Sequence, residues 1–343
     1  MPENTISGKI LLENGTYFPE LQRKKMQRQG RTVTSNVKGK WFLNEVTPMT
    51  VDMRSKLVLG SLALLVAPAL ASAQQVPPVE PNQLVRQMVQ NELHPTDGGH
   101  QFMYKDTTVY KNRSVTKEVV RTPQGPLERT LAIDGGPLSP DQRAKEDAKL
   151  QKFANDADAR RKKQQSDKEE GQREDLMVKT LPDAFLYTYV GTGRGPNGRD
   201  LVHLQFKPNP AFDPPNHETQ VYLGMQGDMY IDLAAERLVK MDGALFKDVN
   251  FGWGILGRLY KGGKFIIKQA DIGSGVWEET EEILQFNGKV LLVKPLQIDS
   301  RETRTDFRPV PSQVTTAQAL DLLHKSDQVV AENGGGARAP NPK

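Results

Sequence analysis

Hydrophobic residues recur at helical spacing near both ends of the chain. In NQLVRQMVQNEL (residues 82–93) the residues that share one stripe are Leu84, Val85, Met88, Val89 and Leu93. This spacing is typical of an amphipathic helix, which Asn82 would cap and Pro95 would end. A second stretch, residues 316–325, has apolar residues at the same spacing: Ala319, Leu320, Leu322 and Leu323. It predicts a closing helix, and the Gly-rich residues 334–343 are expected to be a disordered tail.

Between these helices the period changes to that of strands. Candidate strands are expected at residues 100–105, 114–122 and 127–133, and Gln124-Gly125 would join the last two as a hairpin. In DLVHLQFK (residues 200–207), Val202, Leu204 and Phe206 alternate with Leu201, His203 and Gln205. This alternation predicts a strand with one buried face.

Residues 183–308 continue as a series of short strand candidates. These are FLYTYV, DLVHLQFK, TQVYL, MYIDL, RLVKM, KFIIKQ, VWEETEEILQF, KVLLVK and IDSRETRTDF. Asn287-Gly288 is a type I′ hairpin signal, and Gly262-Gly263 and residues 273–275 suit short loops. Because the connections are too short for crossover helices, the sheet is expected to be antiparallel. The last segment has five charges in ten residues and suits an exposed edge strand.

Residues 139–174 form a charged block between the strands. It holds 10 basic and 9 acidic residues among 36, with a narrow apolar stripe. Ser139, Pro140 and Gln142 provide an N-cap, a first-turn proline and a capping-box partner. The block predicts a long, mostly exposed helix within an insert at 139–180. A solvated charged face and a docking surface for a partner are the two interpretations.

Residues 53–73 have the pattern of a bacterial signal peptide. Arg54 and Lys56 form a basic head, an apolar stretch follows, and Ala71 and Ala73 mark a cleavage signal. The apolar stretch is shorter than the roughly 20 residues that a spanning helix needs. Residues 1–52 are interpreted as an extension produced by a wrongly assigned upstream start. The alternatives are a cytoplasmic tail on a membrane anchor and, for 57–73, a buried core helix.

Removal of this leader changes the net charge of the chain that remains. The chain has 46 Lys and Arg against 42 Asp and Glu, and 10 and 5 of these lie in residues 1–73. The remainder from residue 74 therefore has 36 basic and 37 acidic residues, which gives no compositional case for a nucleic-acid partner. The chain has no cysteine, which excludes disulfides, thiolate metal sites and a lipid-modified N-terminal cysteine. A soluble periplasmic protein is expected.

The patterns that could carry chemistry are weak. The five histidines lack metal-ligand spacing, so neither a metal nor a cofactor is expected. The glycine-rich residues 191–198 precede a strand rather than a helix, which predicts a hairpin loop instead of a phosphate site. Glu278, Glu279, Glu281 and Glu282 form an acidic run split between both faces of a strand. Paired carboxylates can hydrolyse glycosides, but we expect no enzyme here.

One apolar segment is the candidate ligand site. In NFGWGILGRLY (residues 250–260) large apolar groups are separated by glycines. The proposed wall or lid of a ligand cavity consists of Phe251, Trp253, Ile255, Leu259, Phe265 and Trp277. The alternative is ordinary core filling where two strands meet.

Several segments together resemble a known superfamily. MYIDLAAERLVKMDGAL, with Ile231, Asp232, Arg237, Leu238 and Val239, is similar to exported members of the periplasmic outer-membrane lipoprotein carrier (LolA-like) superfamily. Residues 248–265 and 300–308 also resemble that group, and the likeness covers roughly residues 82–308. It implies an α+β fold, an antiparallel half-barrel over residues 74–310 with helices on its concave face and a helix at 311–333. It also implies binding of acyl chains or a lipidated peptide. The charged insert departs from the superfamily's basic plan.

The leading functional hypothesis is a non-catalytic periplasmic protein that binds an apolar ligand, namely an acyl chain, lipid or lipoprotein. Lipoprotein sorting or envelope sensing would be its role, with transient membrane contact. The alternatives are a structural protein that docks onto an envelope partner through the charged helix, and an enzyme. An apolar cavity would favour the ligand-binding protein, and an exposed apolar stripe on the insert would favour the protein that docks onto an envelope partner. Convergent polar residues in a cleft would favour the enzyme.

Overall fold

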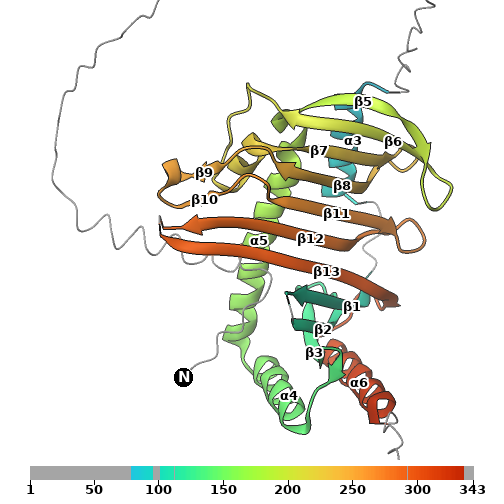
Figure 1. Cartoon of the computed structure of the whole chain (residues 1–343). Coiled ribbons are helices and arrows are strands. Elements are labelled where there is room, and N and C mark those ends of the chain that lie inside the picture. Colours follow the sequence, from blue (N-terminus) through green and yellow to red (C-terminus); the bar gives the residue numbers. More distant parts are fainter. Residues whose placement is uncertain (1–78, 96–100, 112, 292, 336–343) are drawn as a thin grey trace, which may run out of the picture. The chain divides into compact units, whose positions relative to one another are not determined.

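The computed structural model describes residues 79–95, 101–111, 113–291 and 293–335, without the side chains of 253 and 328–335. In this part of the chain the strands form one antiparallel sheet in the order β4-β3-β2-β1-β13-β12-β11-β8-β7-β6-β5 (Figure 1). β4 and β5 lie at the two ends of this order and do not pair with each other, so the sheet is open. The predicted α+β class is confirmed, and the arrangement is consistent with a half-barrel. The expected leader at 53–73 and extension at 1–52 lie outside the described residues.

The charged insert divides the strands into two groups. The strands before it are β1 (Gln101–Tyr110), β2 (Arg113–Val120), β3 (Leu127–Ile133) and β4 (Gly136–Pro137). The strands after it are β5 (Phe185–Arg194), β6 (Asp200–Pro208), β7 (Met225–Asp232), β8 (Arg237–Leu245), β9 (Val249–Phe251), β10 (Gly257–Leu259), β11 (Lys264–Asp271), β12 (Trp277–Val290) and β13 (Lys294–Val310). The groups are joined by β13, which pairs with β12 on one side and with β1 on the other.

Among the described residues, four α-helices and two short 3₁₀ helices accompany the sheet. They are α3 (Pro81–Leu93), α4 (Pro140–Asn155), α5 (Ala157–Ala184), α6 (Thr316–Gly335), η2 (Glu218–Gly224) and η3 (Gly252–Gly254). The predicted N-terminal helix is confirmed, but its cap is Glu80, whose carboxylate accepts the backbone N–H groups of Asn82 and Gln83. Asn82 lies inside the first turn, and its side chain donates instead to the carbonyl of Pro182.

The insert contains two helices rather than the one predicted. The capping box of Ser139 and Gln142 is confirmed at the start of α4. Asp156 then interrupts the helix and caps α5, because its side chain accepts the backbone N–H of Ala159 at 2.8 Å. A side-chain oxygen that accepts a backbone N–H in this way satisfies a free donor of the first turn and so stabilises the start of the new helix.

The main core lies between α3, the C-terminal end of α5 and one face of the sheet, here called the helix-covered face. Its strand residues include Val202, Leu204, Phe206, Met229, Ile231, Met241, Phe265 and Phe286. The predicted alternation along β6 is confirmed, since Val202, Leu204 and Phe206 are buried and their neighbours are not. Tyr222 and Tyr187 donate their hydroxyls to carbonyls of α5, at Met177 and Leu181. These contacts hold α5 against the sheet, where Figure 1 shows it behind the strands.

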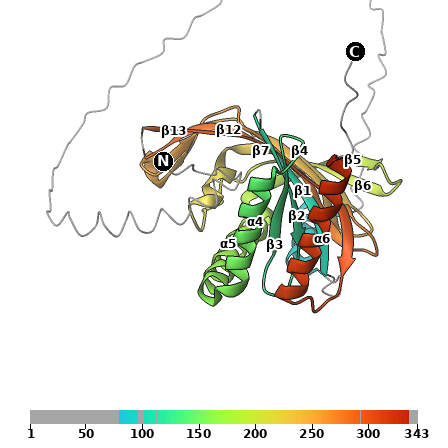
Figure 2. The same ribbon diagram turned by 90° about the horizontal axis from the view of Figure 1, so that it is seen from below.

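A smaller core lies on the opposite face of the N-terminal strands. There α6 contacts β2 and β3 (Figure 2), and its Ala319 and Leu323 pack against Met103, Val120 and Leu127. Successive side chains of a strand point to opposite faces. Met103 therefore points toward α6, whereas Tyr104 points toward the helix-covered face.

Four predictions about strands and turns are wrong. TQVYL forms η2 rather than a strand. Asn287-Gly288 is no turn, because β12 continues through it to Val290, and KVLLVK is not a separate strand. IDSRETRTDF is not an edge strand, since β13 is central in the sheet. Its charges are instead paired with neighbouring strands, for example Arg301 with Glu281 and Asp306 with Lys105.

Candidate functional site

The structure distributes the predicted ligand-wall residues over different environments. Leu259 and Phe265 are buried in the main core, and Phe251 packs against that core. This placement matches the core-filling interpretation of these three residues. Ile255, in the loop after η3, is 55% exposed. The side chain of Trp253, like Ala71 and Ala73, lies outside the described residues.

Trp277 lies far from the rest of the predicted wall. It begins β12, whereas Leu259 pairs with Gly288 near the other end of the same strand. At about 3.3 Å per residue the two points are roughly 35 Å apart. The guanidinium groups of Arg199 and Arg237 lie 5.4 and 6.0 Å from the Trp277 ring centroid. Trp277 thus belongs to a cation–π cluster at a different end of the sheet.

A group of carboxylates on the helix-covered face forms a more distinctive site, here called the acidic recess. It consists of Asp106 on β1, Glu279 and Glu282 on β12, and Glu302 with Arg304 on β13. The strand register brings them together, because Asp106 is the partner of Arg304 and Glu282 is the partner of Glu302. Arg304 lies at the centre and is 2.7 Å from Glu302 and 3.2 Å from Glu279.

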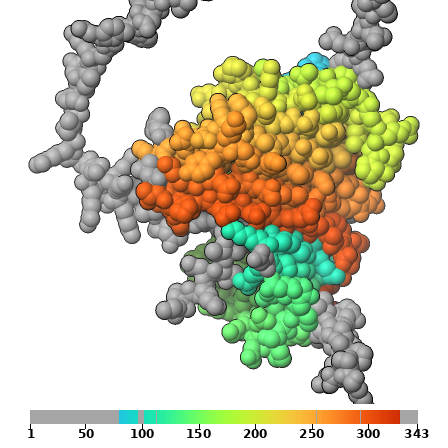
Figure 3. Space-filling view, in the orientation of Figure 1, coloured from blue at the N-terminus to red at the C-terminus, as the bar shows by residue number. Residues whose placement is uncertain are grey.

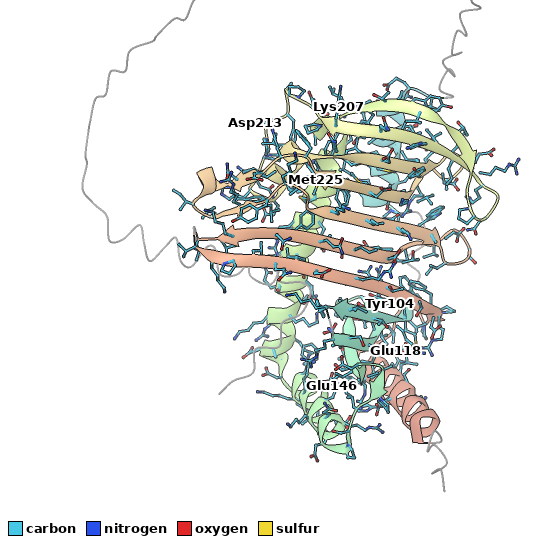
Figure 4. All side chains as sticks on the ribbon, viewed as in Figure 1. Tyr104, Glu118, Glu146, Lys207, Asp213 and Met225 are labelled. Atoms are coloured by element: carbon cyan, nitrogen blue, oxygen red, sulfur yellow. The ribbon has the colours of Figure 1, made fainter. Side chains whose placement is uncertain are left out.

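The recess borders the main apolar core. Glu282 is the partner of Ile267, and Leu284 follows on the same side of β12. Ile267 and Leu284 are partly buried against that core. On the other side, the Tyr104 ring lies 5.9 Å from the Arg304 guanidinium, and Figure 4 places Tyr104 on β1. The site therefore has charged groups at its centre and apolar or aromatic groups beside them.

Burial and mutual repulsion shift the ionisation of these groups. Burial, together with the Glu302 carboxylate, raises the pKa of Asp106 to about 7. Burial raises the pKa of Glu279 to about 7, against the opposing effect of Arg304. Burial and the neighbouring Glu279 and Glu302 raise the pKa of Glu282 to about 8. The carboxyl groups of Asp106, Glu279 and Glu282 are therefore partly protonated near neutral pH.

Negative groups outnumber positive ones in the recess. Glu174 of α5 acts on both Glu279 and Glu282 and raises their pKa values further. Lys117 also lowers the pKa of Asp106, but its ammonium group is already 3.0 Å from Glu128. About one-fifth of the side-chain surface of Glu279, Glu302 and Arg304 stays exposed. The recess is thus accessible, yet it has too few cations to neutralise its carboxylates.

Sequence analysis found part of this site. The acidic run at Glu278–Glu282 is split between both faces of the strand, as predicted: Glu281 pairs with Lys268 and Arg301, while Glu279 and Glu282 enter the recess. An irregularity in the pairing with β11, between Lys268 and Gln269, places Glu279 and Glu282 on one face, which strict alternation would not do. Glu278 pairs with Arg121 instead. Asp106, Glu302 and Arg304 were missed, because the register between β1 and β13 joins residues almost 200 positions apart. The available signal was the pair Glu302 and Arg304, two charged residues of opposite sign that lie two positions apart on one strand and therefore share a face.

The opposite face of β5–β8, β11 and β12, here called the open face, has a shallow groove of about 700 Å³. Figure 3 shows this face of the molecule. Gly227 and Gly243 form part of its floor, with Asp228 and Asp242 beside them. Nearby, His203 Nε2 lies 2.6 Å from Asp228 and the His203 ring stacks on Tyr230. The groove is open and lined by polar and apolar side chains together, and its two aspartates are paired, Asp228 with His203 and Asp242 with Lys240.

The described residues were also compared with the requirements of metal sites and membrane spans. No group of three or more His, Asp or Glu residues among them could hold a metal ion. None of the described helices combines the length and the apolar character that crossing a membrane requires.

Comparison with known proteins gives only remote likenesses. No protein-family model matches the chain. No curated protein matches it either. Among solved structures, a DUF1329 family protein from Desulfovibrio piger is similar over 71% of this chain and 100% of its own, at 10% identity and a TM-score of 0.24. MucB, in complex with MucA(peri), is similar over 70% and 97%, at 10% identity and a TM-score of 0.19. These scores are too low for either likeness to bear on fold or function.

Proposed function

We propose that this chain is an exported, non-catalytic binding protein of the bacterial envelope. Its ligand is an amphiphile, with an apolar chain and a cationic head group, held on the helix-covered face of the sheet. The observation that carries the proposal is the acidic recess, where four strand carboxylates surround one arginine, which pairs directly with two of them, beside an apolar core. Lipids and lipidated peptides that contain an ammonium or guanidinium group belong to this ligand class, and the proposed role is lipoprotein sorting or envelope sensing.

The electrostatics favour a cationic head group. A carboxylate removed from water is destabilised in its charged form unless an opposite charge lies close to it. Arg304 supplies one such charge, and Asp106, Glu279 and Glu282 still have raised pKa values. A bound ammonium or guanidinium group would return these carboxyls to their ionised form. Clusters of strongly perturbed ionisable groups are frequent at functional sites for this reason.

The apolar part of the ligand is inferred from the surroundings of the recess. Ile267 and Leu284 offer partly buried aliphatic surface next to Glu282. An acyl chain laid along them would extend the main core, as binding sites for apolar ligands commonly do. The resemblance of residues 82–308 to the LolA-like superfamily points to the same ligand class. Export is inferred from the signal-peptide pattern of residues 53–73.

The test compares chemically matched probes on the protein recovered from a bacterial periplasm. Dodecylamine, dodecanol and dodecanoate share one chain and differ only in the head group. We expect calorimetry at pH 8.5 to show binding in the order amine, alcohol, carboxylate. The double variant Glu282→Gln/Glu302→Gln should weaken the amine at least ten-fold and leave the alcohol unchanged. Asp299→Asn, an exposed carboxylate on the same strand β13, is the control.

Three results of this test would contradict the proposal. They are equal affinity for the three probes, preference for dodecanoate, and unchanged amine binding by the double variant. Native mass spectrometry of the same preparation identifies any co-purified lipid or lipopeptide. A co-purified ligand without a cationic group would also count against the recess as the head-group site.

A second candidate function is docking onto an envelope partner through the insert. One observation favours it: α5 begins at Ala157 but buries no side chain before Leu181. The first part of α5 is therefore a long charged surface without a core role. Cross-linking from exposed α5 positions in intact cells, followed by mass spectrometry, would identify such a partner. Cross-links restricted to this chain would argue against it.

A further inference from the structure

Large exposed apolar side chains are concentrated at one end of the sheet. Among the described residues, five of the eight such side chains come from two adjacent segments, residues 246–262 and 287–295. They are Phe246, Ile255, Tyr260, Leu291 and Val293. Ile255, Leu291 and Val293 are exposed by 55%, 49% and 84%. We call these last three residues the apolar tip.

The residues of the tip are neighbours in space. β10 pairs with β9 and with the end of β12, so the η3 loop and the β12–β13 turn lie side by side. The backbone N–H of Leu291 donates to the carbonyl of Leu256, the residue next to Ile255. Figures 1 and 2 both show the β12–β13 turn at one end of the sheet, and Figure 1 shows β9 and β10 beside it. Two separate turns therefore present aliphatic side chains from the same end of the molecule.

The same two segments have a strong excess of positive charge. They contain Lys247, Arg258, Lys261, Lys289 and Lys294, against the single acid Asp248. Asp248 pairs with Arg258 at 2.8 Å. None of the four lysines forms an ion pair with a carboxylate of the described residues. The chain from residue 74 onward has slightly more acidic than basic residues, so this positive end is a local feature.

We propose that the apolar tip and its lysines form a docking site for the surface of a bilayer that contains anionic phospholipid. Aliphatic side chains on turns can enter the headgroup region, while lysines around them attract the negative surface. A protein partner of matching shape would need a groove or a flat apolar area, whereas the tip consists of protruding turns. The site is separate from the acidic recess and of opposite charge. It would bring an amphiphile-binding protein to the membrane that supplies or receives its ligand.

The test is vesicle flotation of the protein recovered from a bacterial periplasm, with its N-terminus established by intact mass. The vesicles are phosphatidylethanolamine with 30% phosphatidylglycerol, and pure phosphatidylcholine. We expect binding to the anionic vesicles at 50 mM NaCl, little binding to phosphatidylcholine, and a large loss at 500 mM NaCl.

Two variants separate the apolar and electrostatic contributions. Ile255→Ser/Leu291→Ser/Val293→Ser should lower the partition coefficient at least ten-fold. Lys289→Gln/Lys294→Gln should lower it roughly ten-fold or more at low salt, since each lysine near the surface contributes about five-fold. Leu186→Ser/Val190→Ser removes two exposed apolar side chains of β5 and is the matched control. Any retained leader is identical in all variants, so it cannot produce a difference between them.

The proposal is overturned if the wild-type protein ignores anionic vesicles at low salt, or if the tip variant binds them as well as the wild type. Equal losses in the tip variant and the β5 control would also overturn it. Circular dichroism and the urea midpoint of each variant establish that it is folded. Dodecylamine binding should depend on the recess and not on the tip. Measuring dodecylamine binding by the tip variant therefore distinguishes a failure of membrane docking from a failure of the proposed ligand function.

Discussion

Arg129 on β3 donates a hydrogen bond to Asp327 on α6 over 2.9 Å, and both side chains are almost completely buried. Arg129 also donates to Asp147 on α4 at 2.6 Å. One guanidinium group therefore connects the N-terminal strands, the insert and the C-terminal helix. The pairing explains how three segments far apart in the sequence remain together at this end of the sheet.

Loss of Arg129 should therefore destabilise the fold. Arg129→Met leaves Asp327 buried without its main partner, and we expect the free energy of unfolding in urea to fall by about 3–5 kcal/mol. Arg86→Met is the control, because its partner Asp183 is exposed and the pair contributes at most about 1 kcal/mol. Equal losses of unfolding free energy in the two variants would show that the buried network stabilises the protein no more than an exposed ion pair does.

The raised pKa values of the recess predict that stability falls as the pH rises. A carboxyl whose folded-state pKa lies above its unfolded value binds its proton more tightly in the folded protein. Asp106, Glu279 and Glu282 have folded pKa values of about 7, 7 and 8 against ordinary values near 4. Their contribution is complete below pH 4 and is lost as the pH rises to 8.

We expect the free energy of unfolding of the ligand-free protein, measured in urea, to fall between pH 5 and pH 8.5 by on the order of a few kcal/mol in total. Glu282→Gln should flatten this profile because glutamine cannot ionise. Identical profiles for the wild type and this variant would contradict the raised pKa of Glu282. Urea titrations at five pH values are sufficient for the measurement.

Arg304 should stabilise the protein in a pH-dependent way. Arg304→Gln removes the cation shared by Glu279 and Glu302, and we expect a loss of about 3 kcal/mol at pH 8.5. The loss should be clearly smaller at pH 5.5, where more of the carboxyl groups are protonated. Arg301→Gln, an exposed position on the same strand, should show a small loss at both values. A pH-independent loss for Arg304→Gln would refute the electrostatic account.

The close approach of β7 and β8 requires glycine at position 227. A Cβ atom there would lie 2.0 Å from the carbonyl oxygen of Asp242 on the neighbouring strand. Because backbone cannot move aside easily, Gly227→Ala should cost about 2–3 kcal/mol in urea unfolding. Gly193→Ala on β5 is the control, since its Cβ would meet nothing within 4 Å. A Gly227→Ala protein as stable as this control would show that the strands can separate without cost.

Local patterns predicted the elements whose burial repeats at short range. The stripe of α3, the alternation of Val202, Leu204 and Phe206 on β6, and the capping box at Ser139 depend on residues within a few positions of each other. The Ile231-Asp232 pair also has a local meaning. Asp232 accepts the backbone N–H groups of Ala234 and Ala235 and so shapes the turn between β7 and β8.

The incorrect predictions come from signals that tertiary contacts override. Asn287-Gly288 has the composition of a turn, but Gly288 is required because β10 approaches it closely. A Cβ at Gly288 would lie 2.2 Å from the carbonyl oxygen of Arg258. Similarly, the charges of β13 suggested an exposed edge, whereas each neighbouring strand supplies partners for them. The sequence shows that a residue is charged, but it does not show whether the counter-ion lies in solvent or on the neighbouring strand.

The sequence by itself determined the α+β class, the antiparallel pairing of the strands after the insert, and the helical nature of the insert. These features follow from periodicity, turn residues and connection length, which are all local. Only the tertiary structure decided that β1 pairs with β13 and thereby places Asp106 beside Arg304. It also decided that Leu259 and Phe265 fill the core and that the turns carrying Ile255 and Leu291, which are both exposed, lie side by side. Such pairings depend on strand order and register, which are set by packing of the whole sheet rather than by any short segment.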